Sequence, residues 1–183
     1  GNGSVALDPE ESAYGYGQTI LLSAEPAAGW SFGYWEGAIS GTSNPYELIV
    51  EAEPDITGVF IQQEYTLAVE VTGSGIVSRT NPKSTYYYGD EDTLTAVPDP
   101  GWNFSHWAGD ADGSDNPLNI TLDGSKTVTA VFSQEEYVIT PQITGSGTIT
   151  KQPDQAVYAY GDVVELSATA HPGWTFQGWQ DDV

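Results

Sequence analysis

The sequence offers few groups that could do chemistry, and an acidic loop holds the densest cluster of them. Asp110, Asp112 and Asp115 lie within a single six-residue stretch, and carboxylate oxygens at such spacing can bind Ca²⁺. The loop lacks the twelve-residue calcium-binding pattern that ends in a glutamate. The residues that lie 72 positions earlier, in a segment of similar sequence, are Ala38, Ser40 and Ser43, and none of them carries a carboxylate. We therefore interpret the stretch as a solvated acidic loop, with a calcium site as the weaker alternative.

Tryptophan is the second residue type with a recognisable use, because an exposed indole face can contact a sugar ring or a protein partner. The motif Trp-x-Phe-x-x-Trp occurs at residues 30–35, 102–107 and 174–179. Strand alternation places Trp102 and Phe104 on the same face, which we predict to be the core face. The last tryptophan of each motif falls at an odd spacing, so it points elsewhere unless a β-bulge intervenes. This spacing predicts an exposed contact surface containing Trp35, Trp107 and Trp179.

Two tyrosines before a glycine turn, Tyr86 and Tyr88, are further candidates for that contact surface. Tyrosines recur at the matching positions, which are Tyr14, Tyr16, Tyr158 and Tyr160. Hydrogen-bonded packing at a sheet edge is the alternative interpretation. No phosphate-binding loop, nucleophile elbow or carboxylate pair recurs in the sequence. We therefore predict no catalytic residue, no enzyme activity, and no cofactor, with Ca²⁺ as the one weak candidate.

Charge restricts the partners of this chain. Its 183 residues include 26 acidic side chains and only four lysines and arginines, which gives a net charge of -22. Such a charge repels the phosphates of nucleic acid and the headgroups of an anionic membrane. No apolar run reaches the length of a transmembrane helix. We expect no nucleic-acid partner and no membrane insertion, and the absence of cysteine excludes disulfides.

The elements that would position these side chains recur with a constant period of about 72 residues, without insertion or deletion. The dipeptide Gly-Trp stands at 29–30, 101–102 and 173–174, and Tyr-Gly stands at 16–17, 88–89 and 160–161. Such a fixed register is the signature of a tandem repeat. It predicts three domains: residues 1–64 as a first repeat that lacks its opening strand, 65–136 as a complete second repeat, and 137–183 as a third repeat that stops after its fourth strand.

Within the second repeat, alternating apolar residues predict short β-strands. Leu67, Val69 and Val71 share one face, and Val128, Ala130 and Phe132 share another. Glycine- and proline-rich turns separate five to six such segments. Helix-forming stretches are absent, so we predict an all-β fold of tandem small domains of about 72 residues in an elongated array.

Several landmarks in fixed order carry a resemblance to a known family. They are Thr-Gly-Ser-Gly at 72–75, Tyr-Gly-Asp at 88–90, Pro-Gly-Trp-x-Phe-x-x-Trp at 100–107, Asn-Pro at 116–117 and Val-Thr-Ala-Val-Phe at 128–132. The chain resembles the divergent internalin-type B-repeat family of bacterial surface proteins. The resemblance implies tandem arrays on secreted or surface-attached proteins, and it allows a β-grasp-like unit.

Two functions follow as hypotheses. The first is a non-catalytic structural repeat, extracellular or at a cell surface, that forms a stalk, fibre or filament by end-to-end association. Its partners would be adjacent repeats or neighbouring copies of itself, with strand donation to an incomplete domain as one route. A fragment cut from a longer array explains the incomplete repeats equally well. The second is an adhesin that binds a surface glycan or protein through exposed aromatic side chains.

Overall fold

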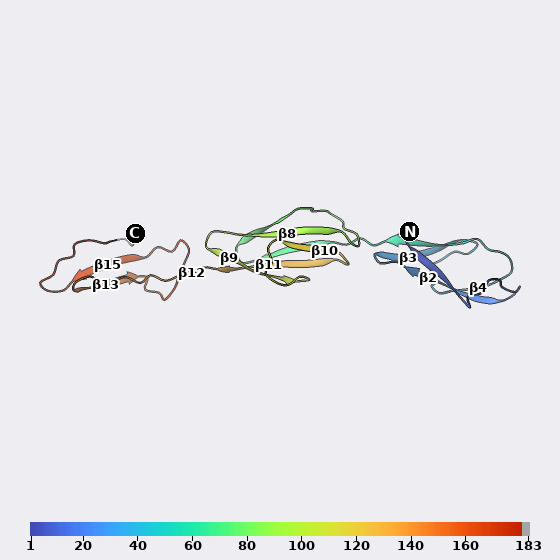
Figure 1. The fold of residues 1–183 in the computed structure, drawn as a ribbon, viewed down its shortest axis with the longest axis horizontal. Helices are drawn as coiled ribbons and strands as arrows, with labels where there is room; N and C mark the ends of the chain where they lie inside the picture. Colours follow the sequence, from blue (N-terminus) through green and yellow to red (C-terminus); the bar gives the residue numbers. More distant parts are fainter. Residues whose placement is uncertain (181–183) are drawn as a thin grey trace.

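The computed structural model describes residues 1–180, which form β-strands, turns and loops without a helix. Three groups of strands lie one after another along the long axis of the molecule (Figure 1). We call residues 1–64 unit 1, residues 65–136 unit 2 and residues 137–180 unit 3. The predicted all-β fold is confirmed, and a β-grasp unit, which would include a helix, does not occur in the described chain.

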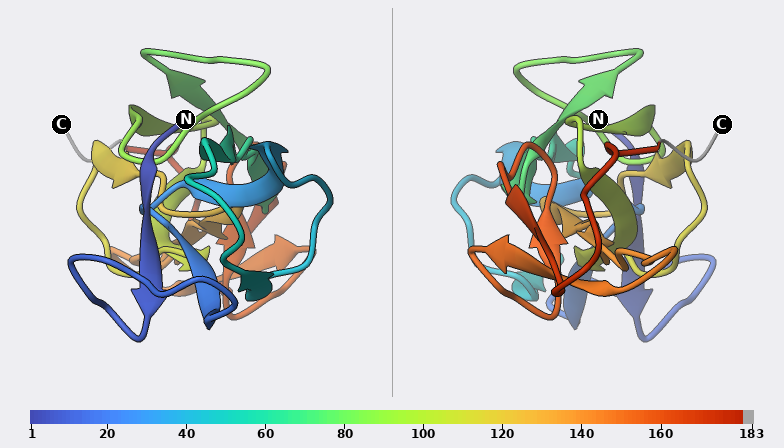
Figure 2. Two further views of the ribbon diagram at one scale, coloured as in Figure 1. Left: turned by 90° about the vertical axis from the view of Figure 1, so that its right-hand side faces the viewer. Right: turned by 90° about the vertical axis from the view of Figure 1, so that its left-hand side faces the viewer.

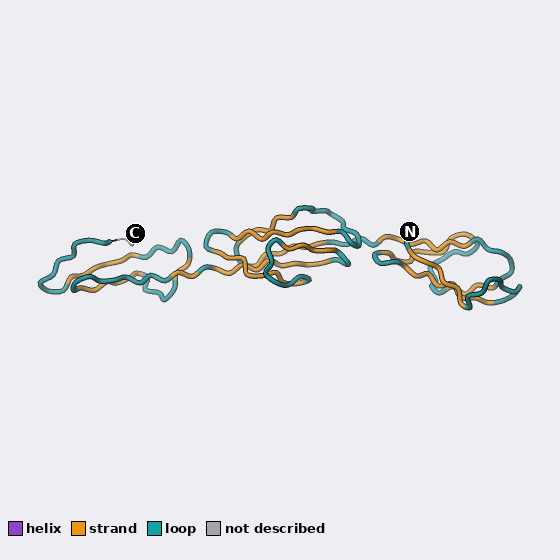
Figure 3. Tube along the Cα trace, viewed as in Figure 1, coloured by secondary structure: helices purple, strands orange, loops and turns teal. Residues whose placement is uncertain are grey.

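Unit 2 contains the six strands predicted from its alternating pattern. They are β6 (Leu67–Thr72), β7 (Gly75–Arg79), β8 (Glu91–Pro98), β9 (Trp102–Gly109), β10 (Leu118–Thr121) and β11 (Lys126–Gln134). One sheet has the order β10-β8-β7 and the other has the order β6-β11-β9. Strand β11 pairs parallel with β6 and antiparallel with β9, so both of its edges are occupied. Figure 3 shows the strands of the three units in orange, with loops between them.

The core of unit 2 lies between these sheets, because every second side chain of each strand points inward. Leu94 on β8 and Val128 on β11 are fully buried, and Leu67 on β6 is 7% exposed. Phe132, which is 4% exposed, belongs to the same core. A unit of about 70 residues buries a smaller fraction of its surface on folding than a large domain does. Its aromatic side chains therefore supply a large part of the apolar contact.

Unit 1 repeats this arrangement with one strand fewer. Its strands are β1 (Gly3–Asp8), β2 (Thr19–Pro26), β3 (Trp30–Gly37), β4 (Tyr46–Ile49) and β5 (Ile56–Gln62). They form the sheets β1-β2-β4 and β3-β5. Residues 1–64 contain no counterpart of β6, so β5, the counterpart of β11, pairs only with β3.

Unit 3 is the least complete of the three. Its strands are β12 (Glu136–Tyr137), β13 (Gly147–Gln152), β14 (Tyr158–Ala159) and β15 (Glu165–Ala170). The expected strand at residues 174–176 does not form, and residues 138–144 also stay outside every sheet. Both segments correspond to strands that pair with β11 in unit 2, and residues 1–180 provide no such partner in unit 3.

The views along the long axis show the units one behind another (Figure 2). The period of the sequence therefore corresponds to a translation along one direction rather than to a ring. Because the described residues contain no helix, none of their segments meets the length and hydropathy that a membrane-crossing helix requires.

Candidate functional site

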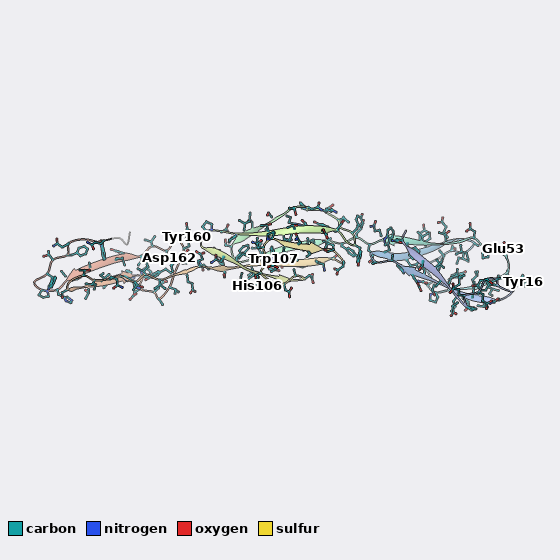
Figure 4. The ribbon with its side chains drawn as sticks, in the orientation of Figure 1. Tyr16, Glu53, His106, Trp107, Tyr160 and Asp162 are labelled. Carbon is teal, nitrogen blue, oxygen red and sulfur yellow. The ribbon has the colours of Figure 1, made fainter. Side chains whose placement is uncertain are left out.

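The prediction of an exposed contact surface is wrong for two of its three tryptophans. Trp35 and Trp107 are each 1% exposed and belong to the cores of units 1 and 2. Trp107 is labelled in Figure 4. The pairing of β9 with β11 shifts register after Phe104, because Ser105 is an extra residue opposite the bond between Val131 and Phe132. This β-bulge turns the later residues of β9 over, so Trp107 joins Phe104 on the core face. The ring centroids of Phe104 and Trp107 are 5.0 Å apart.

The acidic loop positions the indole of Trp107. Trp107 Nε1 donates a hydrogen bond to the carbonyl oxygen of Asp115 at 2.9 Å, and its backbone N–H donates to Gly113 O at 2.8 Å. Asp110 Oδ2 accepts the backbone N–H of Thr127 at 2.7 Å. Among the described residues, no three His, Cys, Asp or Glu side chains converge as ligands of a metal ion. The same loop geometry recurs in unit 1, where Trp35 Nε1 donates to Ser43 O, so it does not depend on the carboxylates.

Tyr86 is also buried, which contradicts its place in the predicted contact surface. It is 0% exposed, and its hydroxyl lies 2.9 Å from Asp92 Oδ2 and 3.0 Å from Asn81 O. Asp92 also bonds Arg79, whose Nη2 lies 2.9 Å away, and Arg79 Nη1 donates to Leu67 O at 3.3 Å. This cluster fastens β6 to the sheet that contains β7 and β8.

The carboxyl group of Asp92 is charged despite its burial. Burial raises its pKa, but hydrogen bonds outweigh this effect and hold the pKa below the usual range. The donors are the backbone N–H of Asn81, the hydroxyl of Tyr86, the Arg79 guanidinium and the backbone N–H of Thr93. Asp92 is therefore a structural anion, and it has no counterpart in unit 1, where Ile20 stands at this position.

Tyr88, the remaining candidate of unit 2, lies at the boundary between two units. Its Cβ packs so closely on Gly29 of unit 1 that a Cβ on Gly29 would overlap it. The side chain remains 52% exposed. The turn that carries Tyr88 is closed by Asp90, whose Oδ2 accepts the backbone N–H of Tyr87 at 2.9 Å. This hydrogen bond, together with Lys83, holds the pKa of Asp90 below its usual value.

The boundary between units 2 and 3 repeats the same contact one repeat later. Tyr160 packs on Gly101 as Tyr88 packs on Gly29, and Tyr160 lies between the two units in Figure 4. Asp162 Oδ2 accepts the backbone N–H of Ala159 at 2.8 Å, as Asp90 does for Tyr87. Gly29 and Gly101 have φ angles of 77° and 80°, a region that favours glycine.

The chain that crosses each boundary is hydrogen-bonded on both sides. Gln63 N donates to Gly29 O at 2.8 Å, and Tyr65 exchanges two backbone hydrogen bonds with Tyr86. At the second boundary, Glu135 N donates to Gly101 O at 2.8 Å, and Tyr137 pairs with Tyr158. We call these two sets of residues the first joint (Gly29, Gln63, Tyr65, Tyr86, Tyr88) and the second joint (Gly101, Glu135, Tyr137, Tyr158, Tyr160).

Comparison with known proteins matches all three units to one family. Residues 1–64, 65–136 and 137–183 each match the divergent InlB B-repeat domain. The chain belongs to the divergent InlB B-repeat family. No curated protein and no solved structure matches it. B-repeat domains typically occur in bacterial surface proteins and are generally non-catalytic.

One landmark of this B-repeat has a role that the sequence did not reveal. Asn116, in the Asn-Pro dipeptide, accepts the backbone N–H of Ala96 at 2.9 Å and donates to Ala96 O at 2.8 Å. Asn44 makes the same two bonds to Ala24 in unit 1, both at 2.8 Å. The side-chain amide thus replaces a strand residue beside β8 and β2. The asparagine recurs at the same position of two repeats, as Asn44 and Asn116, and this recurrence was the feature of the sequence that could have indicated its role.

The exposed tryptophan and phenylalanine side chains of the described B-repeats all lie in unit 3. Trp179 is 49% exposed, and Phe176 and Trp174 are 48% and 58% exposed. These are counterparts of core or half-buried residues in unit 2, so their exposure follows from the missing partner strands. Tyr16, the counterpart of Tyr88, is 85% exposed at the outer end of unit 1 (Figure 4).

Proposed function

We propose that this chain is a non-catalytic spacer segment of an extracellular or cell-surface protein, in which B-repeats are held in a row as a stiff rod. The observation that carries the proposal is the repeated joint, in which Tyr88 packs on Gly29 and Tyr160 packs on Gly101. Two joints with the same contacts give each unit the same placement relative to the previous one. A single repeated placement generates a straight or regularly twisted rod.

The linkers support stiffness rather than free rotation. Strand β5 ends at Gln62 and β6 begins at Leu67, so few residues cross the first joint. Gln63 is bonded to unit 1 and Tyr65 is bonded to unit 2. A flexible linker would need unbonded residues whose φ and ψ angles can vary. Here the hydrogen-bonded residues Gln63 and Tyr65 fix the orientation of unit 2 relative to unit 1.

The rod can be tested by measuring the distance between equivalent sites in two units. Thr42 and Ser114 occupy matching exposed positions, and the chain has no cysteine, so a Thr42→Cys/Ser114→Cys variant accepts two spin labels. Pulsed electron paramagnetic resonance should give one narrow distance distribution. A broad distribution in this otherwise unchanged chain would show units that move independently, and the spacer proposal would fail.

A matched pair of variants shows whether the tyrosine contact causes the stiffness. Tyr88→Ser removes the side chain that packs on Gly29, and we expect it to broaden the distance distribution. Tyr16→Ser changes the equivalent residue of unit 1, which contacts no other unit of the described chain. This control should leave the distribution unchanged.

The adhesin alternative has less support, because Trp35, Trp107 and Tyr86 are buried. Trp179 remains available for stacking on a sugar or a protein. A glycan array screened with the full chain and with Trp179→Ala tests this alternative. Binding that depends on Trp179 would favour an adhesin over a pure spacer.

A further inference from the structure

A shallow polar hollow of about 450 Å³ lies on the outer face of one sheet of unit 2. It extends across the whole sheet β10-β8-β7, because Asn119 lies on β10, Thr93 lies on β8, and Thr80 directly follows β7. Small-molecule sites have volumes of about 300–1,000 Å³ and a few polar groups that converge on the ligand. The hollow therefore has the size and the polar lining of a binding site, within a repeat that contains all six strands.

A buried carboxylate holds the floor of this hollow. Asp92 is 3% exposed, and its Oδ1 accepts the backbone N–H groups of Asn81 and Thr93, both at 2.8 Å. Its Oδ2 is bonded to the Arg79 guanidinium and to the Tyr86 hydroxyl, each at 2.9 Å. The floor is thus fixed by bonds within unit 2, and Arg79 balances its charge. A ligand would be recognised by the groups that lie above Asp92.

Three side chains above the floor carry hydrogen-bonding groups that the described chain does not use. Thr93 Oγ1 donates to Asn119 Oδ1 at 2.8 Å, which fixes the Asn119 amide and leaves its Nδ2 without a partner among residues 1–180. Asn81 Nδ2 donates to Glu91 O at 3.2 Å, which leaves Asn81 Oδ1 as an acceptor. The ion pairs of residues 1–180 all use aspartates, so the Glu91 carboxylate is unpaired there.

The polar floor is specific to unit 2. Pro9 and Pro153 replace Asn81 in units 1 and 3, and proline has no N–H for a carboxylate to bind. The position of Asp92 changes together with it, to Ile20 and Val164. Unit 1 forms the equivalent sheet β1-β2-β4 without these polar residues. The repeat fold therefore does not require the polar hollow, which favours a binding role that unit 2 alone performs.

The unused groups match the hydroxyls of a neutral saccharide. A sugar hydroxyl both donates and accepts hydrogen bonds, and the hollow offers acceptors on Glu91 and Asn81 and a donor on Asn119. An ammonium group only donates, so it would leave the Asn119 donor unpaired. An acidic saccharide would be repelled by the Glu91 carboxylate and by the net charge of -22. Strand β8 is paired on both sides, so a peptide cannot be added beside it as a strand.

We propose that the hollow on unit 2 binds a neutral saccharide. Glu91 and Asn81 accept hydrogen bonds from its hydroxyls, and Asn119 Nδ2 donates to a sugar oxygen. Thr93 acts as a positioning residue, because its hydroxyl holds the Asn119 amide. The site goes beyond the spacer function, and it differs from stacking on Trp179 because it uses hydrogen bonds on a complete repeat.

A glycan array probed with the full chain tests the class of ligand. Neutral glucans, mannans, galactans and chitin oligosaccharides are printed beside saccharides that carry carboxylate, sulfate or amino groups. We expect binding to at least one neutral series and no binding to its acidic counterparts. A chain that binds no neutral saccharide, or that prefers the acidic or amino members, would overturn the proposal.

Nuclear magnetic resonance of the isotope-labelled full chain locates the bound saccharide. The neutral oligosaccharide that binds best on the array is titrated to about 10 mM, which detects millimolar dissociation constants. The backbone amides of Glu91 and Thr93 and the side-chain amide of Asn119 should shift. Leu21 and Glu47, the unit 1 counterparts of Thr93 and Asn119, should not shift. Shifts confined to unit 3 would place the sugar on the exposed aromatic side chains there and would overturn the hollow as the site.

A matched pair of variants connects binding to the hollow. Thr93→Leu introduces the residue that unit 1 carries as Leu21, so the repeat fold accepts it. It fills the hollow and removes the bond to Asn119, and we expect the affinity to fall at least tenfold. Thr95→Leu makes the same change on the same face of β8 outside the hollow, and it should keep the affinity. Equal affinities of the two variants would contradict the proposed site.

A third variant tests the role of the unpaired carboxylate. Glu91→Gln keeps the size of the side chain but removes its charge, and the residue is exposed, so folding should not change. Hydrogen bonds to a charged acceptor are stronger than those to a neutral one, so we expect weaker saccharide binding. An unchanged affinity would remove Glu91 from the site.

The saccharide site and the spacer function can fail separately. No residue that lines the hollow belongs to the first or the second joint. Loss of saccharide binding in Thr93→Leu should therefore leave the distance distribution between units 1 and 2 unchanged.

Discussion

Tyr88 of unit 2 packs directly on the backbone of Gly29 in unit 1, where no side chain larger than hydrogen fits. The two residues are far apart in sequence, yet the same contact joins Tyr160 to Gly101. The period of the sequence therefore applies to the boundary between units as well as to the units themselves.

Gly29→Ala should disturb the first joint. The new Cβ would overlap Tyr88, so unit 2 has to move relative to unit 1. Spin labels at positions 42 and 114 should report a shifted or broadened distance distribution. Gly173→Ala is the matched control, because Gly173 also has a positive φ, of 85°, but nothing lies within 4 Å of its added Cβ. An unchanged distribution in Gly29→Ala would contradict the joint.

Trp107→Ala should destabilise unit 2 by about 3 to 5 kcal/mol, because it empties a large part of the core. The indole is 1% exposed and packs on Phe104. Trp179→Ala should have a much smaller effect, because that side chain is 49% exposed. Denaturant unfolding followed by the remaining tryptophan fluorescence measures both. Equal effects would show that the β-bulge does not turn Trp107 into the core.

Asn116→Ala should lower the free energy of unfolding of unit 2 by about 2 kcal/mol, because it leaves the N–H and C=O of Ala96 without their partner. The Asn116 amide supplies both bonds to Ala96. Asn119→Ala removes only an exposed contact to the Thr93 hydroxyl and should change stability little. Amide hydrogen exchange at Ala96 gives a local reading. Continued protection of this amide in Asn116→Ala would argue against the proposed role.

Unit 2 should lose stability in acid through Asp92. The pKa of this carboxyl is lower in the folded state than in the unfolded chain, where it is about 3.9. The folded state therefore binds fewer protons, and the stabilisation is present above about pH 4 and is lost as the pH falls through the folded pKa. Asp92→Asn should flatten this dependence. Unit 1, with Ile20 at the matching position, provides the internal comparison.

Replacing Asp92 also tests its contacts at neutral pH. Removing one partner of a buried ion pair costs roughly 3 kcal/mol or more. Asp90→Asn, at the solvent-exposed pair with Lys83, should change the melting temperature little. Similar losses in the two variants would show that the Arg79–Asp92 contact contributes no more than a surface pair.

Calcium should not stabilise the chain specifically. The carboxylates of Asp110, Asp112 and Asp115 do not converge, and the described residues contain no cluster of three metal-ligating side chains. The net charge of -22 makes any divalent cation reduce self-repulsion. We expect equal melting-temperature changes with millimolar Ca²⁺ and Mg²⁺. A larger shift with Ca²⁺ that disappears in Asp112→Asn would restore the calcium site.

Strand β9 shows where prediction from alternation succeeds and where it fails. Alternation correctly put Phe104 against the core, but it also predicted that Trp107 points outward. A single extra residue at Ser105 reversed the outcome for every later residue of the strand. Bulges depend on how two strands pair, so a pattern within one strand cannot locate them.

Tyr86 and Tyr88 show the same limit. Both precede the same glycine turn in the sequence, yet one is buried and the other reaches a neighbouring unit. Their different surroundings depend on Asp92 and Gly29, which come from other strands and another unit. Only the folded arrangement brings these residues together.

The sequence by itself determined the period, the all-β class and the strands of unit 2, because these depend on local alternation, turn residues and regular recurrence. The tertiary structure alone decided which aromatic side chains are buried and how Tyr88 joins the units. The reason is physical: burial and joints are contacts between segments distant along the chain, and neither periodicity nor composition specifies which segments meet.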